Sequence, residues 1–333
     1  MGALDPQANH HLFGHEATAS SLAEAGVTGH LHHAWLLTGA WGIGKATLAF
    51  RLARWLLADR PEGQAPLEVP PDHPVSRRIA AGSHSDLRVL SPTAGTGVKR
   101  MIRVDDVRAL SRFVGLTAAE GAWRIILIDQ VEAMNAEAQN ALLKTLEEPP
   151  PGALLLLVSA APDRLLPTIR SRCRRLELFP LKNGEMQEAM KCLAPDLSEE
   201  QRSTLVRIGS GSPGKALGMA GGDGLALHEQ VSAFLAALPF VGGQDLHQLA
   251  DMLSSGRDGA AFGTFMALLR DQLGDALRRS ARGQPAPAFL GSRPLADWAT
   301  LWDTLGRLAT ETEHLNLDRR QAVLSGLSQL ASR

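Results

Sequence analysis

The chain contains only two cysteines, Cys173 and Cys192, among its 333 residues. Two thiols can build neither a framework of several disulfides nor a zinc site of four thiolates. No apolar run approaches the roughly 20 residues that a membrane-spanning helix needs, and Met1–Gly14 lacks the basic and apolar regions of a signal peptide. These absences exclude a disulfide-rich secreted domain and predict a cytoplasmic protein.

The chain also has no excess of positive or negative charge, because its 34 lysines and arginines are balanced by 35 aspartates and glutamates. Such a balance gives no global attraction to nucleic acid or to acidic membranes, so any contact of that kind must come from a local patch. A charged content of 21% beside 44% hydrophobic residues is that of a soluble globular protein. The length exceeds one ordinary core, so we expect two or three domains.

The first half of the chain alternates short apolar runs with helical patterns, which is typical of an α/β core with a parallel sheet. The apolar runs suit strands buried on both faces. They are Ala34–Leu37, Asp86–Leu90, Ile125–Asp129 and Leu154–Ser159. The helical patterns are Lys45–Leu57, Val104–Val114 and Ala136–Leu146, and the last places Ala138, Leu142 and Leu146 on one helix face.

Two stretches interrupt this pattern. Ala58–Pro74 contains five prolines and is expected to hold no regular structure. Ser91–Lys99 is rich in Gly, Thr and Ser and is expected to be a mobile loop. After about residue 180 only helical patterns remain, so the predicted domains are a core over residues 1–180, a small helical lid over 181–222 and an all-helical C-terminal domain over 223–333.

A glycine-rich segment, Gly39-Ala40-Trp41-Gly42-Ile43-Gly44-Lys45, joins the first predicted strand to a predicted helix. That context is the one required of a P-loop, and it disfavours the alternative of a glycine turn with a solvated lysine. Glycines let backbone N–H groups turn toward phosphates, while the lysine reaches the β- and γ-oxygens. The predicted nucleotide-binding residues are Gly39, Gly42, Ile43, Gly44, Lys45, Ala46, Thr47, Asp129 and Ser159.

Two positions of this site lack the residues that hydrolysis needs. The P-loop lysine is normally followed by Ser or Thr, whose hydroxyl binds Mg²⁺. Here Ala46 follows it, and Thr47 lies about 100° further round the helix. Asp129 ends a buried strand and is placed either to hold Mg²⁺ through water or to cap the next helix. Gln130 then stands where a base for the attacking water is required, so we expect weak or absent hydrolysis.

Two further features near residue 170 have alternative interpretations. Ser159 ends the last predicted strand, where its side chain either interacts with a γ-phosphate or makes a strand-end hydrogen bond. Leu165–Cys173 predicts a short helix within a basic stretch that holds Arg170, Arg172, Arg174 and Arg175. These arginines form either a solvated edge or, for Arg172, an arginine finger offered to a neighbouring subunit's nucleotide. Such a finger is worth about 10³–10⁵ in rate.

Three segments taken together resemble the clamp-loader branch of AAA+ proteins. They are His33–Gly39, Asn140–Pro150 and Ser171-Arg172-Cys173. The Leu-Leu-Lys-Thr-Leu-Glu-Glu-Pro-Pro run and the Ser-Arg-Cys triplet are specific to that branch. The resemblance covers about residues 10–220, and the helix pattern extends it to the end. It implies an AAA+ core, a lid and a C-terminal collar that joins five subunits in an open ring.

The resemblance also implies a role in replication, in loading a sliding clamp onto primed DNA. The implied partners are the gamma/tau and delta subunits of the DNA polymerase III clamp loader, the clamp and the DNA. Leu165–Thr168, Gly211–Gly214 and the degraded metal and glutamate positions fit a non-motor subunit. In that role Arg172 completes a neighbour's ATP site, and the chain is a component of the polymerase holoenzyme without ATPase activity of its own.

The chain departs from the family's pattern in two places. Many relatives carry a four-cysteine zinc module after the P-loop helix, but Ala58–Pro74 has no cysteine, so zinc is not expected. Motor subunits place an arginine in the lid near the γ-phosphate. Here Gly214 stands at that position and Lys215 follows it, which puts a lid sensor in question. Binding of ATP or ADP, with Mg²⁺ only beside the nucleotide, stays open.

Two other functions stay open from the residues alone. One is the motor subunit itself, against which Ala46 and Gln130 argue. The other is an unrelated P-loop kinase or transferase, which needs neither the collar nor the Ser-Arg-Cys triplet. Contact with DNA is expected through helix N-termini and basic side chains. Arg100 and Arg103 are candidates for it, although a solvated loop and helix start is the favoured interpretation.

Overall fold

The structure, a computed structural model, describes residues 5–63, 65–94, 100–255, 259–291 and 293–331. The chain divides into two compact units, one that extends to Leu217 and one that begins at Gly218. The division falls inside a helix, α9 (Pro213–Ala220). The helices that the sequence assigns to the lid therefore belong mostly to the first unit. Within the described ranges, no helix is long and apolar enough to cross a membrane.

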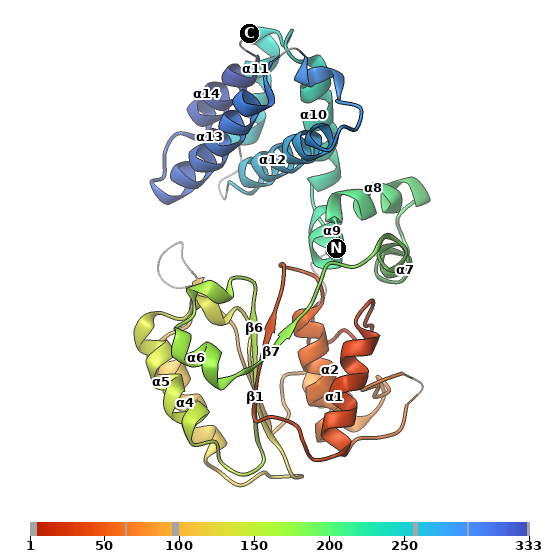
Figure 1. Cartoon of the computed structure of the whole chain (residues 1–333), viewed down its shortest axis with the longest axis vertical. Helices are drawn as coiled ribbons and strands as arrows, with labels where there is room; N and C mark the ends of the chain where they lie inside the picture. Colours follow the sequence, from red (N-terminus) through yellow and green to blue (C-terminus); the bar gives the residue numbers. More distant parts are fainter. Residues whose placement is uncertain (1–4, 64, 95–99, 256–258, 292, 332–333) are drawn as a thin grey trace. The chain divides into compact units, whose positions relative to one another are not determined.

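A five-stranded sheet, parallel throughout, forms the centre of the first unit (Figure 1). Its strands lie in the order β2 (Leu87–Leu90), β5 (Arg124–Ile128), β6 (Ala153–Ser159), β1 (Ala34–Thr38) and β7 (Arg174–Glu177). The three central strands are buried along their whole length, because helices cover both faces of the sheet. The four predicted strands are confirmed within one residue at each end, and so is the α/β class.

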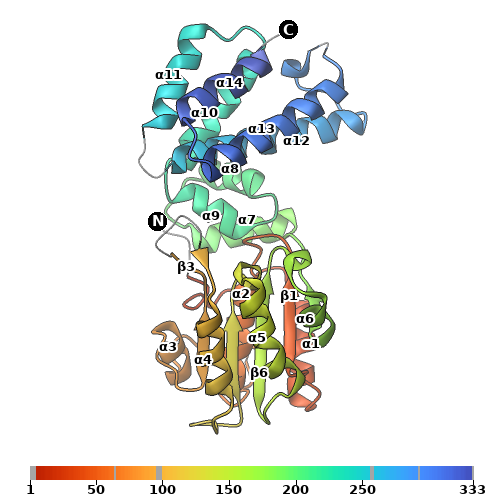
Figure 2. The same cartoon turned by 90° about the vertical axis from the view of Figure 1, so that its left-hand side faces the viewer.

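Helices cover the sheet in two layers (Figures 1 and 2). One layer is α1 (Glu16–Val27), α2 (Lys45–Leu57) and α3 (Pro74–Ala80), and the other is α4 (Val104–Val114), α5 (Ala136–Glu147) and α6 (Pro167–Arg172). Along β6, Leu154 and Leu156 pack into the first layer while Leu155 and Leu157 pack into the second, as the two-residue period of a strand requires. Two 3-10 turns, Val131–Ala133 and Pro162–Arg164, complete this region.

The sequence prediction missed three short strands of the described chain. Arg174 and Arg175 belong to β7, an edge strand that pairs with β1. One of the two interpretations of these arginines was a solvated edge. The guanidinium of Arg174 lies 5.1 Å from the centre of the Trp35 ring.

The prediction of a loop over Ser91–Lys99 is wrong at Thr93–Ala94, because this segment (β3) pairs antiparallel with Arg100–Met101 (β4). Residues 95–99 lie outside the described residues.

The proline-rich stretch behaves as predicted with one exception at its end. Among the described residues from 58 to 73 there is no helix or strand. Pro74, however, is the first residue of α3, with the His73 side chain accepting a hydrogen bond from Val75 N–H. Proline is favoured at the first position of a helix because its missing N–H has no partner there in any case.

All described elements after residue 180 are helical, in agreement with the sequence. The lid helices are α7 (Asn183–Leu193), α8 (Glu199–Gly209) and α9. The second unit contains α10 (Gly224–Ala237), α11 (Gly243–Ser254), α12 (Ala260–Ala281), a 3-10 turn at Ala288–Leu290, α13 (Leu295–His314) and α14 (Arg319–Ala331). Within it, α12 buries Phe262, Phe265 and Leu269, and Trp302 Nε1 of α13 donates to the carbonyl oxygen of Arg270 at 2.9 Å.

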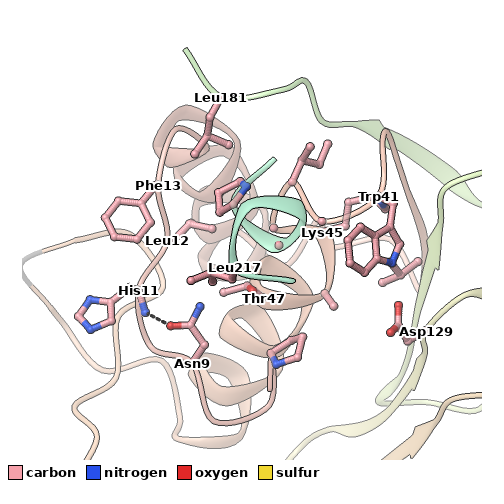
Figure 3. Close-up of a pocket in the computed structure, with 18 of the residues that line it drawn as sticks. Asn9, His11, Leu12, Phe13, Trp41, Lys45, Thr47, Asp129, Leu181 and Leu217 are labelled. Carbon is pink, nitrogen blue, oxygen red and sulfur yellow. Dashed lines mark hydrogen bonds between the residues drawn. The ribbon is translucent and has the colours of Figure 1, made fainter. Parts of the chain in front are cut away.

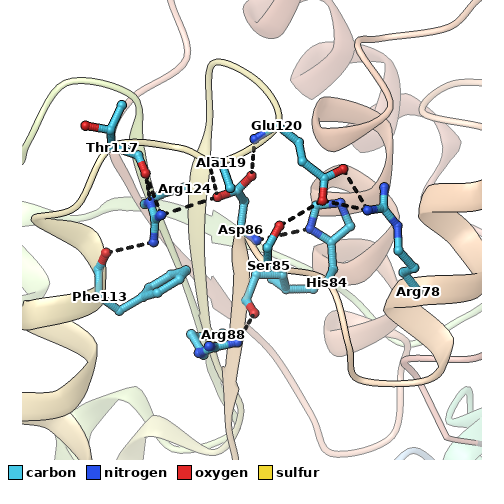
Figure 4. Close-up of polar contacts among 11 residues, drawn as sticks. Arg78, His84, Ser85, Asp86, Arg88, Phe113, Thr117, Ala119, Glu120 and Arg124 are labelled. Atoms are coloured by element: carbon cyan, nitrogen blue, oxygen red, sulfur yellow. Dashed lines mark hydrogen bonds and ion pairs between the residues drawn. The ribbon is translucent and has the colours of Figure 1, made fainter.

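A buried ion pair fastens the amino ends of β2 and β5 (Figure 4). The carboxylate of Asp86 is fully buried and accepts hydrogen bonds from the N–H groups of Ala119 and Glu120 at 2.8 and 2.9 Å. Arg124 Nη2 lies 3.6 Å from this carboxylate. The same guanidinium donates to the Thr117 carbonyl at 2.8 Å and lies 4.6 Å from the centre of the Phe113 ring. The pair therefore holds the loop between α4 and β5 on the sheet.

We predict that Asp86→Ala destabilises this unit by about 3–5 kcal/mol, because it leaves a buried guanidinium without its counter-ion and two backbone N–H groups without their acceptor. Hydrogen exchange of the β5 amides in the full chain measures this loss. Asp105→Ala is the matched control, since Asp105 pairs with Arg108 at 3.3 Å but is 86% exposed. It should cost less than about 1 kcal/mol. Equal losses in the two variants would contradict the prediction.

Candidate functional site

The turn between β1 and α2 has the backbone that a P-loop requires. Gly39, Gly42 and Gly44 have φ values of +141°, +76° and +103°, which residues with a Cβ atom rarely adopt. Gly44 immediately precedes Lys45, the first residue of α2. The free N–H groups of the first helical turn and the positive end of the helix dipole thus belong to this turn, as an anion site needs.

The Lys45 side chain is turned back onto the loop that precedes it. Its Nζ donates to the carbonyl oxygens of Gly39 and Ala40 at 2.9 and 2.6 Å. The residue is only 5% exposed, and burial lowers its pKa while the nearby Glu132 and Asp129 carboxylates oppose that shift. A phosphate oxygen could replace these carbonyls as the acceptor without a change in the lysine's surroundings, so the site suits an anionic group.

Asp129 follows β5 and faces this region (Figure 3). Its Oδ1 accepts a hydrogen bond from Gln130 N–H at 3.0 Å. Burial raises the pKa of this carboxyl, while that hydrogen bond and the Lys45 ammonium oppose the shift. The helix-cap alternative for Asp129 is wrong, because Asn135 caps α5 by accepting from Ala138 N–H at 2.9 Å. Asp129 is therefore free of a capping role.

Ser159 makes a hydrogen bond at the end of its strand, which was one of the two interpretations of this residue. Its Oγ accepts from Ala161 N–H at 3.1 Å, and the residue is fully buried. The next N–H, that of Ala160, donates to Glu132 Oε1 at 2.9 Å. Serine and glutamate together fix the backbone at the end of β6.

A cavity of about 260 Å³ lies beside the P-loop (Figure 3). Its walls include Trp41, Gly42, Ile43, Gly44, Lys45, Ala46 and Thr47, together with Asp129, Gln130, Val158 and Ala160 from the strand ends. Seven of the nine predicted nucleotide-binding residues thus share one cavity. Gly39 and Ser159 are not among the described residues that line it.

Two walls of the cavity were not found from the sequence. The N-terminal segment contributes Pro6, Asn9, His11, Leu12 and Phe13, and the lid contributes Leu181, Leu193, Pro213, Gly214 and Leu217. Within the N-terminal segment Asn9 Oδ1 accepts from His11 N–H at 2.9 Å. For the N-terminal wall the available signal was the apolar pair Leu12–Phe13, which belongs to no predicted strand or helix; for the lid wall it was Gly214, at the position that the resemblance places near the γ-phosphate. These walls give the cavity an apolar side next to the P-loop.

The amino end of α9 is bonded directly to the P-loop. Gly214 N–H donates to the Gly42 carbonyl at 2.8 Å, and Ser212 Oγ donates to the Trp41 carbonyl at 2.9 Å. A Cβ atom added to Gly214 would lie 2.8 Å from Gly42 Cα. A side chain at this position would therefore push the amino end of α9 off the P-loop.

Arg172 is the last residue of α6, and it is not among the described residues that line the cavity. Its Nη2 lies 2.8 Å from Glu147 Oε1, and its Nη1 donates to the Thr168 carbonyl at 3.1 Å. The side chain is 37% exposed. The next residue, Cys173, is buried, which raises the pKa of its thiol to about 12 and keeps it protonated.

The remaining candidates give no second site. Arg103 is exposed at the start of α4, where its N–H donates to Asp106 Oδ2 at 3.1 Å, and Arg100 belongs to β4. In the part of the chain that is described, no cluster of three His, Cys, Asp or Glu side chains is arranged to hold a metal ion.

Comparisons with known proteins agree on one family. The family model for "DNA polymerase III, delta subunit" matches residues 14–182. The DNA polymerase III subunit delta' of Pseudomonas aeruginosa is 41% identical over 182 residues, which are 54% of this chain and 53% of that protein. The Escherichia coli protein of the same name is 30% identical over 302 residues, 90% of this chain and 82% of that protein.

A second class of relative is nearly as similar. The DNA polymerase III subunit tau of Escherichia coli is 32% identical over 305 residues, which are 86% of this chain and 46% of that protein. The chain thus spans about half the length of tau and of the Pseudomonas aeruginosa relative that it matches.

We predict that Gly214→Ala weakens the contact between lid and P-loop by about 1–3 kcal/mol, the usual cost of forcing a methyl group into a packed site. Hydrogen exchange at the amides of residues 214 and 215 measures this change. Gly218→Ala in the same helix is the control, because a Cβ atom there would meet nothing within 4 Å. It should stabilise α9 by about 0.5–1 kcal/mol. Unchanged exchange in Gly214→Ala would show that the contact is not held.

Proposed function

Because the chain belongs to the family of DNA polymerase III delta-prime subunits, we propose that it is a non-motor subunit, or stator, of the clamp loader. The complex that it serves places a sliding clamp on primed DNA in the cytoplasm. The proposed partners are the gamma/tau and delta subunits, the clamp and the DNA. The observation that carries the proposal is Arg172, which is charged and accessible but does not belong to the cavity of its own chain.

Arg172 suits the role of an arginine finger offered to a neighbouring ATP site. A guanidinium stays charged at every physiological pH and presents N–H donors in a planar fork that matches phosphate oxygens. Its position at the end of a short helix, 37% exposed, leaves it within reach of a docked subunit. The finger stabilises charge that develops in the transition state, so its loss lowers the rate of the neighbour's reaction.

The chain's own P-loop is proposed to hold ATP or ADP weakly and without turnover. Lys45 would exchange two backbone carbonyls for phosphate oxygens, and Asp129 would hold Mg²⁺ through water when nucleotide brings the metal. Ala46 offers that metal no hydroxyl, and the Gln130 amide cannot accept a proton from water. The 260 Å³ cavity is slightly below the range of about 300–1,000 Å³ usual for ligand pockets, in keeping with weak binding.

A second candidate function is that of the ATP-hydrolysing motor subunit. The identity of 32% to tau over 86% of this chain favours it, whereas Ala46 and Gln130 oppose it. A purified chain that hydrolyses ATP with Mg²⁺ at about 1 s⁻¹ or faster would be a motor and not a stator. The kinase or transferase alternative is set aside by the family to which the chain belongs.

We predict that Arg172→Ala lowers ATP turnover at the neighbouring site at least about tenfold in a clamp loader reconstituted with gamma/tau and delta subunits, because an arginine finger acts on the transition state. ATPase activity stimulated by clamp and primed DNA measures this, with assembly checked by gel filtration. Arg170→Ala is the control, since Arg170 lies on the same helix but pairs with Asp163 at 3.2 Å. It should leave turnover unchanged. Normal turnover in Arg172→Ala would remove the finger assignment.

We predict that Lys45→Ala raises the dissociation constant for ADP by about ten- to a hundredfold, because one charge-assisted hydrogen bond contributes about 1.5–3 kcal/mol. Isothermal titration calorimetry of the full chain measures this. Lys191→Ala removes an exposed lysine from α7 and should bind ADP as the wild type does. If both variants and the wild type bind equally, the P-loop takes no part in nucleotide binding.

A further inference from the structure

The last residues of two helices meet in an ion pair. Glu147 ends α5 and Arg172 ends α6, and Glu147 Oε1 lies 2.8 Å from Arg172 Nη2. The opposite arm of the guanidinium, Nη1, donates to the carbonyl of Thr168, one helical turn earlier, at 3.1 Å. Both arms of the fork are thus held by this chain, which leaves further N–H groups of the guanidinium for another acceptor.

The stability of α5 does not account for a carboxylate at this position. A negative charge in the last turn of a helix opposes the helix dipole, which favours cations there. Arg172, by contrast, is favourably placed at the end of α6. An ion pair between side chains that are 48% and 37% exposed also adds little to the stability of a fold. The pair therefore points to a role for Glu147 other than holding the helices together.

The backbone that carries Glu147 is fixed by contacts on both sides. Leu142 and Leu146 are buried in the core below α5. The Leu146 carbonyl is hydrogen-bonded to His33 Nε2 at 3.1 Å, and Thr145 Oγ1 to Ser111 Oγ at 2.9 Å. Cys173, in the same core cluster, fixes the backbone next to Arg172. The backbone positions of both residues are thus fixed, so the ion pair restricts the rotamers that the Arg172 side chain can adopt.

We propose that Glu147 is a positioning residue, which orders the Arg172 guanidinium before the neighbouring nucleotide arrives. This inference rests on the proposed finger role of Arg172. A free arginine side chain populates many rotamers, and binding must restrict them. A carboxylate that already holds one arm reduces that restriction, and preorganised charge is the form in which an arginine is most effective at a transition state. Glu147 therefore acts on turnover at the neighbouring site and not on the fold.

The test uses the reconstituted clamp loader and measures kcat and KM for ATP with clamp and primed DNA. Glu147→Ala should lower kcat at the neighbouring site about five- to tenfold, as small misplacements of catalytic groups do, with KM unchanged. Glu147→Gln, which keeps an acceptor but loses the charge, should fall between Glu147→Ala and the wild type. Glu148→Ala is the matched control, since Glu148 is the next residue, exposed, and has no described ion pair with Arg172. It should leave kcat unchanged.

A double mutant separates positioning from a structural effect. If Glu147 acts only through Arg172, then adding Glu147→Ala to Arg172→Ala should cause no further loss, because the two residues act as one unit. A further loss in the double mutant, or a higher kcat in Glu147→Ala, would overturn the inference. So would an unchanged kcat in Glu147→Ala when Arg172→Ala is impaired. An unchanged kcat in Arg172→Ala itself would instead overturn the proposed function.

Discussion

Burial of the three central strands on both faces is the constraint from which the site follows. β1, β5 and β6 are apolar along nearly their whole length, so they are stable only between two layers of helices. Because all strands of the sheet are parallel, their carboxyl ends meet at one edge. The P-loop, Asp129 and Ser159 come together there although more than a hundred residues separate the first from the last. The Asp86–Arg124 pair fastens the opposite edge.

At that edge the lid and the P-loop are joined backbone to backbone. The hydrogen bond from Gly214 to Gly42 and the one from Ser212 to Trp41 exist only because no side chain intervenes at either glycine. The same two glycines therefore shape the P-loop turn and its contact with the lid. The proposed finger role of Arg172 places the contribution of this chain at its surface and outside this closed site.

The sequence predicted those elements whose side chains are buried, because burial selects continuous or periodic apolar runs. β7 was not predicted because Arg174, Arg175 and Glu177 are all exposed at a sheet edge. The β3–β4 hairpin was not predicted because its strands have only two residues each. In the site, the P-loop residues were recognised from their spacing, but Ser212 and Trp41 stand 171 positions apart, and no local pattern connects such positions.

The residues alone determined the α/β class, the P-loop turn, the missing hydroxyl at Ala46 and the missing carboxylate at Gln130. Those properties depend on side-chain chemistry and on neighbours within one turn or one strand. Only the tertiary structure decided that Asp129 is not a helix cap, that the N-terminal segment and the lid line the cavity, and that Arg172 is bound to Glu147. Each of these depends on which distant segments meet, because packing of the whole unit determines such contacts and no short stretch of sequence does.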